Sequence, residues 1–346
     1  MGPKPAELGG PLLLRIPNWL GDLVLALPVI EAAASHPGAR PLLLVGPATF
    51  ERLLTSRLPG VRYLASGRGS RYALVGPIRR ERPRSALLLT ESFSSALLVT
   101  LAGVPVRVGF GAEGRSPLLT VRVPRPRPAR STPRAVEYRK LALAAGIRVA
   151  QAEPSLRALD AERQDAARVC AALGVSRTAY AVMAPGASYG PAKRWAPERF
   201  AEVARHLREV RGLPTVLVGA GEDREAANSV LAHAPGVASA VGQTDLPTLV
   251  GLLEGAIAVL SNDSGVMHLA AALHRPTAAI FGSTSPVWTA ASAPWVANLY
   301  AGYPCSPCFR RACAIGYGCL RSITAAHVAR ELDALLGPGD RGGDGG

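Results

Sequence analysis

The sequence predicts an α/β protein made of two doubly wound units, each a parallel sheet covered by helices on both faces. Short apolar runs typical of buried strands alternate with longer helical stretches along most of the chain. The alternation stops at residues 111–134 and later starts again. At 346 residues the chain is long enough for two domains with separate cores.

Five apolar runs in the first half are predicted to be strands, because each has the length of a buried strand and is rich in leucine or valine. They cover residues 12–16, 41–45, 61–65, 85–90 and 106–110. Helical stretches lie between them at 23–34, 48–57, 70–80 and 93–102. Residues 111–134 hold five prolines and many arginines, so we expect a loop there. Two more helices are predicted at 134–145 and 160–173.

The second half repeats this pattern. Strands are predicted at 179–185, 214–219, 255–260 and 276–282, and helices at 197–211 and 222–233. We therefore expect a first domain at 1–172, a second at 173–322, a C-terminal helix at 323–336 and a disordered, glycine-rich tail at 337–346. The strand ends of two such units should line an interdomain cleft, where open α/β sheets bind ligands.

The basic residues are concentrated in the first half. Residues 1–172 carry 25 Lys and Arg against 12 Asp and Glu, whereas the remaining residues carry 14 against 13. Such an asymmetry favours a polyanion or an anionic membrane surface as the partner of the first half. No apolar run approaches the roughly 18 residues of a membrane-spanning helix, and the N-terminus lacks the pattern of a secretion signal. We therefore expect a cytoplasmic protein.

The stretch SNDSGVMHLAAAL, residues 261–273, follows an apolar strand and begins a helix, and its first five residues, Ser261–Gly265, suit a tight turn and a helix start. The first amides of a helix have no partners within it and carry positive partial charge, so Ser264 and Gly265 suit a phosphate group, and His268 is a further candidate. Asp263 is a candidate for holding sugar hydroxyls or orienting a lysine. The alternative is structural: Asp263 or Ser264 caps the helix, and His268 is a packing residue.

Two further turns are expected at the edge of the same sheet. In APGASYGPAKRW, residues 184–195, Gly186 and Ser188 would let a ligand approach closely, and Lys193 is one of only three lysines in the chain. A compact ammonium suits a diphosphate leaving group, although most lysines are merely solvated. In VGAGEDR, residues 218–224, an arginine replaces the third glycine of a dinucleotide fingerprint, and Glu222 or Asp223 could accept hydrogen bonds from a ribose or a base edge, or cap the helix.

In the first half, the turn NWLGD at 18–22 follows the first strand. Asp22 should therefore lie at the carboxyl edge of the sheet, where it could accept a proton from a substrate hydroxyl as a general base. It is the only acid between Glu7 and Glu31, so we expect no neighbouring carboxylate to raise its pKa. As an alternative, Asp22 could cap the helix.

These motifs carry a family resemblance. NWLGDLVLALP, APGASYGPAKRW, SNDSGVMHLAAAL and the later CSPCFRRACAIGYGC resemble, in the same order, motifs of the bacterial heptosyltransferases of glycosyltransferase family 9. The resemblance covers roughly residues 12–336. It implies a GT-B fold of two Rossmann-like domains, in which the first binds the acceptor and the second binds ADP-heptose. The implied reaction is a metal-independent, inverting transfer of heptose to the inner core of lipopolysaccharide.

The resemblance also implies residue roles. Asp22 matches the catalytic base and Lys193 the phosphate-binding lysine, while Asp263, Ser264, Gly265 and His268 match the nucleotide-sugar motif. The acceptor would be a phosphorylated, Kdo-bearing lipid A at the inner face of the cytoplasmic membrane, which would hold the protein peripherally. The residues expected to face this acceptor or the membrane are Asn18, Trp19, Arg125, Arg127 and Arg130.

Four cysteines follow the spacing C-x2-C-x4-C-x5-C: Cys305, Cys308, Cys313 and Cys319. In a cytosolic protein this pattern favours a thiolate site for a structural Zn or Fe ion over disulfides. The alternative is four reduced thiols in a tight loop.

Other functions remain as alternatives. A family 9 enzyme could use another donor sugar or acceptor. The pI of 10.3 suggests a nucleic-acid-binding protein, but only 5% of the residues are aromatic and no nucleic-acid-binding module is recognisable, so we expect no nucleic acid partner. A nicotinamide-dependent dehydrogenase is disfavoured by the incomplete fingerprint.

Overall fold

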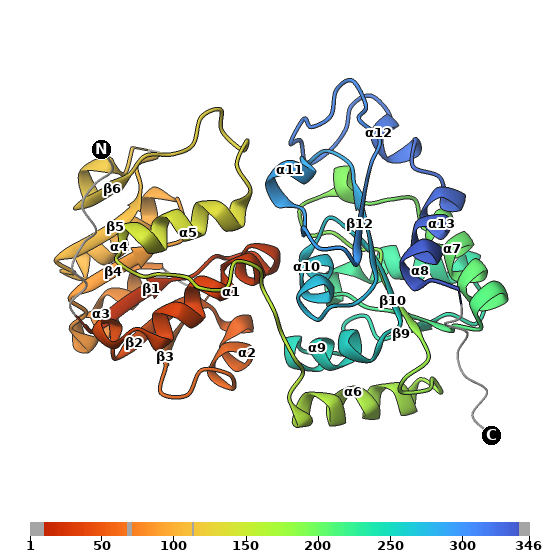
Figure 1. The fold of residues 1–346 in the computed structure, drawn as a ribbon, viewed down its shortest axis with the longest axis horizontal. Helices are drawn as coiled ribbons and strands as arrows, with labels where there is room; N and C mark the ends of the chain where they lie inside the picture. Colours follow the sequence, from red (N-terminus) through yellow and green to blue (C-terminus); the bar gives the residue numbers. More distant parts are fainter. Residues whose placement is uncertain (1–9, 68–70, 113, 339–346) are drawn as a thin grey trace. The chain divides into compact units, whose positions relative to one another are not determined.

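The structure is a computed structural model that describes residues 10–67, 71–112 and 114–338 (Figure 1). The chain divides into two compact units, Met1–Pro154 and Ser155–Gly346. The described part of each unit contains one six-stranded, wholly parallel sheet. The predicted fold class is therefore confirmed. Residues 339–346 of the predicted tail lie outside the described residues.

The first sheet has the strand order β3-β2-β1-β4-β5-β6, so the first strand lies near its centre. Its strands are β1 (Leu12–Arg15), β2 (Leu42–Pro47), β3 (Arg62–Ser66), β4 (Ser85–Leu88), β5 (Val106–Phe110) and β6 (Val121–Val123). Strand β1 pairs with β2 on one side and β4 on the other, and Leu12, Leu13 and Leu14 are completely buried. Continuous apolar runs are typical of parallel strands with both faces covered.

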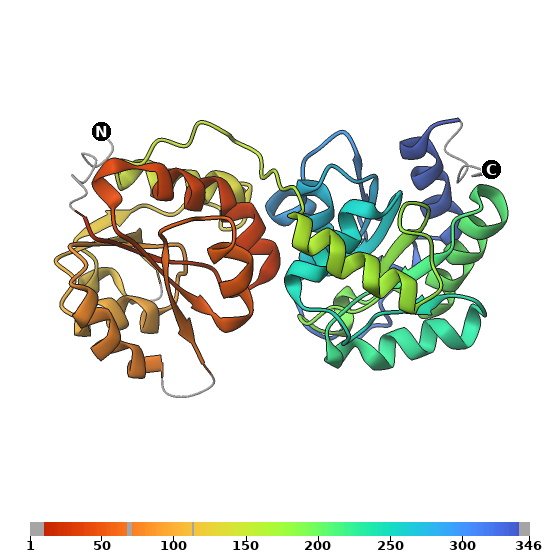
Figure 2. The same cartoon turned by 90° about the horizontal axis from the view of Figure 1, so that it is seen from below.

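Helices cover both faces of this sheet (Figures 1 and 2). They are α1 (Leu20–Ser35), α2 (Glu51–Thr55), α3 (Val75–Glu81), α4 (Phe93–Leu101) and α5 (Arg134–Ala144). Helix α1 begins three residues earlier than predicted, so that Asp22 lies in its first turn. Pro28 is accommodated within α1 and is buried.

The expectation of a loop over residues 111–134 is wrong in part. This segment contains a short 3-10 helix, Ser116–Leu118, and the edge strand β6. Arg115, completely buried, donates from Nε to the carbonyl of Phe110 at 2.9 Å and from Nη1 to the carbonyl of Thr90 at 2.7 Å. The prolines of the segment lie outside β6, where they do not interrupt its pairing with β5.

The second sheet has the order β12-β11-β10-β7-β8-β9. Its strands are β7 (Ala181–Ala184), β8 (Thr215–Leu217), β9 (Ala238–Ser239), β10 (Ala258–Asn262), β11 (Thr277–Phe281) and β12 (Val296–Tyr300). The sequence analysis missed the edge strands β9 and β12. Strand β10 continues through Ser261 and Asn262, which were predicted to lie in the following turn.

The helices of the second unit surround this sheet. They are α6 (Asp160–Ala172), α7 (Pro197–Arg211), α8 (Arg224–His233), α9 (Leu246–Gly255), α10 (Gly265–Ala272), α11 (Pro286–Thr289), α12 (Gly318–Arg321) and α13 (Ala325–Leu336). No helix within the described ranges is long and apolar enough to cross a membrane.

Helix α6 belongs to the second unit, so the boundary between the units follows Pro154 and not residue 172, where the sequence analysis placed it. Arg163 on α6 pairs with Glu254 on α9, with Nε 2.7 Å from Oε2. The two helices approach so closely that a Cβ on Gly251 would lie 2.2 Å from the carbonyl oxygen of Glu162. This packing is long-range and leaves no local signal at residue 172.

Candidate active site

Open α/β sheets bind ligands at the carboxyl ends of their strands, where the chain switches sides. In the second unit this switch lies between the adjacent strands β7 and β10. The loop at 185–196 follows β7, and the turn at 263–264 joins β10 to α10. These are the two stretches in which the sequence predicts phosphate-binding residues.

The structure brings Lys193 and Asp263 together. Nζ of Lys193 lies 2.6 Å from Oδ2 of Asp263 and 3.3 Å from its carbonyl oxygen. Both side chains are largely buried, at 12% and 4% exposure. Nζ also lies 5.0 Å from the centre of the Tyr189 ring, within cation–π range. Because an ammonium has three N–H donors, Lys193 keeps donor capacity for a ligand.

Asp263 is paired with Lys193, which is the contact that one of the two roles expected for it requires. Thr284 donates a hydrogen bond to the same carboxylate oxygen, Oδ2. The main-chain N–H of Asp263 donates to Ile280 at 2.9 Å, which holds the turn against β11. A buried charge pair of this kind needs such additional hydrogen bonds to offset the loss of hydration.

Asn262, a residue absent from the predicted site, joins the two loops. It is completely buried. Its Oδ1 accepts from the main-chain N–H of Trp195 at 3.0 Å, and its Nδ2 donates to the carbonyl of Pro185 at 2.8 Å. Asn262 therefore fixes both ends of the loop that carries Lys193. Sequence reasoning placed it in a turn, and nothing local to it reveals contacts with residues so distant in the chain.

The first turn of α10 has the predicted geometry of a capped helix. Ser264 accepts from the N–H of Val266 at 3.3 Å, and its hydroxyl lies 3.0 Å from that of Ser261. Gly265 is the first residue of the helix, where main-chain amides have no helical acceptor. The structural alternative for Ser264 is thus present and is compatible with phosphate binding by these amides.

His268 lies on α10 and is buried, at 5% exposure. Burial lowers its pKa to about 4, with Lys193 acting in the same direction and Asp263 opposing them. Its Nδ1 has no hydrogen-bond partner among the described residues. His268 is therefore neutral at pH 7 and cannot contribute a positive charge to a phosphate site.

Gly186 and Glu222 lie beside the buried carboxylate of Asp223, the alternative to Glu222 in the predicted turn. A Cβ on Gly186 would lie only 2.0 Å from Oδ1 of Asp223. Asp223 is 7% exposed, and its Oδ2 accepts from the N–H of Ala220 at 3.0 Å. Glu222 is exposed and accepts from Oγ of Ser188 at 3.1 Å. The glycine at 186 therefore makes room for Asp223.

In the first unit, Asp22 is half-buried, with 27% of its side chain exposed. Its Oδ1 lies 3.4 Å from Nε of Arg134 on α5. Burial raises the pKa of Asp22, while Arg134 and a hydrogen bond with Tyr138 lower it. The expectation that no carboxylate raises this pKa is wrong, because Glu91, which follows β4, also does so. A raised pKa makes Asp22 a better proton acceptor.

The residues predicted to face an acceptor differ in their surroundings. Asn18 and Trp19 are exposed just before α1, and Oδ1 of Asn18 accepts from Nη2 of Arg15 at 2.7 Å. Arg127 and Arg130 are exposed. Arg125 instead pairs with Glu91, with 2.6 Å between Nη1 and Oε2. Arg125 is therefore part of the surroundings of Asp22.

The four clustered cysteines are free thiols. Cys319 is buried, Cys305 and Cys308 are exposed, and Sγ of Cys313 accepts from the N–H groups of Ile315 and Tyr317 at 3.4 and 3.3 Å. These bonds lower the pKa of Cys313. Within the described ranges, no group of three or more Cys, His, Asp or Glu side chains is placed to hold a metal ion.

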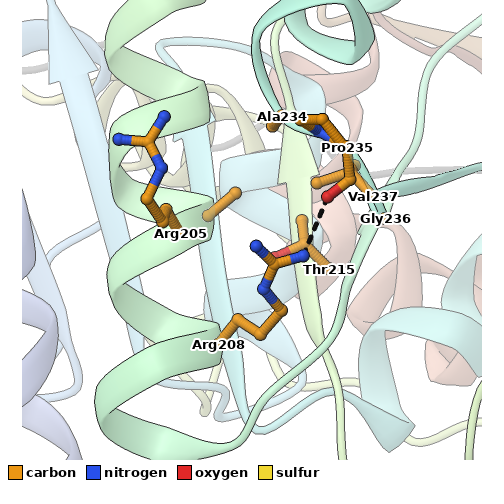
Figure 3. Close-up of a pocket in the computed structure, with 8 residues that line it drawn as sticks. Arg205, Arg208, Thr215, Ala234, Pro235, Gly236 and Val237 are labelled. Carbon is orange, nitrogen blue, oxygen red and sulfur yellow. Dashed lines mark hydrogen bonds between the residues drawn. The ribbon is translucent and has the colours of Figure 1, made fainter.

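A small pocket lies elsewhere in the second unit (Figure 3). It is lined by residues of α7, by Thr215 at the start of β8 and by the chain between α8 and β9. Arg208 reaches across it to donate to the carbonyl of Pro235 at 2.8 Å. Thr215 marks the amino-terminal edge of the sheet, so this pocket is not part of the site built from Lys193 and Asp263.

Comparison with known proteins gives consistent matches. Residues 71–317 match the model of glycosyltransferase family 9 (heptosyltransferase). Lipopolysaccharide heptosyltransferase 2 of Escherichia coli K12 is 34% identical, over 94% of this chain and 98% of its own length. The Salmonella typhimurium protein of the same name is 32% identical over the same shares. The solved structure of E. coli ADP-heptose lps heptosyltransferase II superposes with a TM-score of 0.74 and 32% identity, covering 94% and 98% of the two chains.

Proposed function

The chain belongs to glycosyltransferase family 9, and we propose that it transfers heptose from ADP-L-glycero-D-manno-heptose to the inner core of lipopolysaccharide, as a heptosyltransferase II. Because it belongs to this family, the protein is a glycosyltransferase. The observation that carries the diphosphate-linked donor is the Lys193–Asp263 pair beside the first turn of α10. The names of the matched relatives include lipopolysaccharide and ADP-heptose. This supports ADP-heptose as the donor and lipopolysaccharide as the acceptor, and it does not support a nucleic acid partner.

In this proposal the second unit binds the donor. The ammonium of Lys193 and the free amides at Ser264 and Gly265 stabilise the negative charge that develops on the departing diphosphate. Glu222 and Ser188, which are exposed and hydrogen-bonded to each other, bind the ribose side of the nucleotide. His268 belongs to the same motif and is an uncharged residue within it. Gly186 contributes indirectly, by leaving room for Asp223.

The first unit supplies the base. Asp22 removes the proton from the acceptor hydroxyl, whose oxygen attacks the anomeric carbon from the face opposite ADP. The bond between that carbon and the β-phosphate oxygen breaks, and ADP leaves with both electrons. The transfer inverts the anomeric configuration. Because Lys193 and the helix amides stabilise the negative charge on the leaving group, the reaction needs no catalytic metal ion.

We propose that the acceptor is a phosphorylated Kdo–lipid A at the inner face of the cytoplasmic membrane, where the protein binds peripherally. The net charge of +13 over residues 1–172, from 25 basic and 12 acidic side chains, suits such an anionic surface. Asn18, Trp19, Arg127 and Arg130 are exposed and are the candidates for this contact. Arg127→Gln combined with Arg130→Gln should weaken binding to anionic liposomes, and unchanged binding would contradict the proposal.

A structural Zn or Fe ion at the cysteine cluster is also proposed. Cys305, Cys308, Cys313 and Cys319 lie within one short segment, and N–H···S bonds of the kind made to Cys313 stabilise a thiolate. The ion would require the exposed Cys305 and Cys308 to close on the other two sulfurs. Elemental analysis of the purified protein, repeated with Cys308→Ser, tests this; less than about one metal per ten chains would refute it.

The proposed activity is tested by a donor screen. Purified protein is incubated with ADP-heptose, ADP-glucose, UDP-glucose or GDP-mannose and with either a defined Kdo–lipid A or its heptosylated form as acceptor, and the masses of the products are measured by mass spectrometry. We expect a gain of one heptosyl unit from ADP-heptose only. Transfer from another nucleotide sugar would instead identify a family 9 enzyme with a different donor.

A further inference from the structure

Asp22 belongs to a cluster of ionisable side chains gathered from distant parts of the first unit. Helix α5 supplies three of them, the turn after β4 supplies one, and the segment after β6 supplies another. The cluster consists of Asp22, Glu91, Arg125, Arg134, Glu137 and Tyr138. It therefore contains three carboxylates and two guanidinium groups.

Arg134 lies at the centre of this cluster. Its Nη1 contacts Glu91 and lies 2.8 Å from Oε2 of Glu137, a side chain that is completely buried. Its Nε lies 3.1 Å from the hydroxyl of Tyr138 and 3.4 Å from Oδ1 of Asp22. The planar guanidinium is thus held on two edges, and the direction of its Nε is fixed.

We propose that Arg134 is a positioning residue that holds the Asp22 carboxylate and that Glu91 opposes it electrostatically. This inference rests on the proposed role of Asp22 as the base. Arg134 keeps Asp22 ionised and directed toward the acceptor, while Glu91, which contacts Nη1 of Arg134, limits that stabilisation. A carboxylate stabilised too strongly would be a poor proton acceptor.

The groups that face Asp22 act in opposite directions. Arg134 and Tyr138 favour its ionised form, whereas burial and Glu91 disfavour it. Arg125 neutralises part of the charge on Glu91, because their side chains pair at 2.6 Å. Removing Arg134 should therefore raise the pKa of Asp22, and removing the charge of Glu91 should lower it. A residue that only supported the fold would not produce shifts of opposite sign.

The direct test is a titration of the aspartate carboxyl groups by ¹³C NMR, with the Asp22 signal assigned by its loss in Asp22→Asn. Arg134→Gln should raise the pKa of Asp22 by about 1 unit or more, as expected for the loss of an adjacent opposite charge. Glu91→Gln should lower it by a smaller amount. Arg139→Gln, on the same helix but bonded only to the carbonyl of Ala152 among the interactions described, is the matched control.

The pH dependence of transfer gives a second readout. The acid limb of the pH profile of kcat should move to higher pH in Arg134→Gln and to lower pH in Glu91→Gln. The KM for ADP-heptose should be nearly unchanged in both variants. Tyr138→Phe, which removes only a hydroxyl, should raise the pKa of Asp22, as Arg134→Gln does. It replaces Arg134→Gln in this test if Arg134→Gln does not fold. An unchanged pKa of Asp22 in the folded variants would overturn the inference. Shifted pKa values in a protein without heptose transfer would instead refute the proposed function alone.

Discussion

Lys193 donates to Asp263 twice, with Nζ 2.6 Å from the carboxylate oxygen and 3.3 Å from the main-chain carbonyl of the same residue. One lysine is thereby attached to the turn between β10 and α10, the turn whose amides we propose bind the diphosphate. The position of the ammonium therefore depends on a buried carboxylate that is itself held by Thr284. This dependence leads to the first prediction.

Lys193→Met should weaken ADP binding at least tenfold and lower stability by about 3 kcal/mol, because Asp263 is left buried without its counter-charge. Combining Lys193→Met with Asp263→Asn should restore most of the stability but not the affinity. Isothermal titration with ADP and urea unfolding measure the two effects. Lys140→Met, at an exposed position on α5, is the control. Wild-type affinity in Lys193→Met would contradict the diphosphate role.

His268 should make the protein less stable in acid. Its pKa in the folded state is about 4, against 6.5 for an ordinary histidine, so the unfolded chain binds the proton first as the pH falls. Stability due to this residue is present above about pH 6.5 and is lost between pH 6.5 and 4, amounting to about 3 kcal/mol.

Urea unfolding of wild type and His268→Gln across this pH range measures that loss. The variant should show a shallower fall in unfolding free energy, while His233→Gln, at an exposed position, should follow the wild type. Parallel curves for wild type and His268→Gln would show that folding does not lower the pKa of His268 and would contradict the prediction.

Gly186→Ala should lower the free energy of unfolding by about 1–3 kcal/mol, because the added Cβ meets the Asp223 carboxylate at 2.0 Å. Gly221→Ala has no heavy atom within 4 Å of the added Cβ and serves as the control. Adding Asp223→Ala to Gly186→Ala should remove the steric part of the loss. An equal effect of both glycine substitutions in chemical denaturation would argue against the close contact.

The fold was predictable where local patterns decide it. The buried strand β7 is a continuous apolar run, and helix α7 ends at Gly212 in the left-handed conformation that favours glycine. The edge strands β6 and β9 have only three and two residues, and β12 is interrupted by Asn298 and buries only Leu299, so none of them shows the pattern of a buried strand. The place of α6 in the second unit depends on its contact with Gly251 and Glu254, which no local signal reveals.

The candidate site was predictable in its charged and glycine residues and not in the groups that hold them. Lys193 was selected as a rare lysine beside a glycine-rich loop, and Asp263 as an acid at a helix start. Asn262 and Arg134 were missed, because their importance comes from contacts made across the fold. Arg125 was assigned to the membrane by composition alone, whereas the structure pairs it with Glu91.

The central claim is that the Asp22 carboxylate acts as the base while the second unit holds the nucleotide. The most direct measurement compares wild type and Asp22→Asn for heptose transfer and for ADP-heptose binding, with Glu31→Gln on the same helix as the control. We expect Asp22→Asn to lose a factor of about 100 to 10,000 in kcat and to bind ADP-heptose with nearly wild-type affinity. Full turnover by Asp22→Asn would contradict the account.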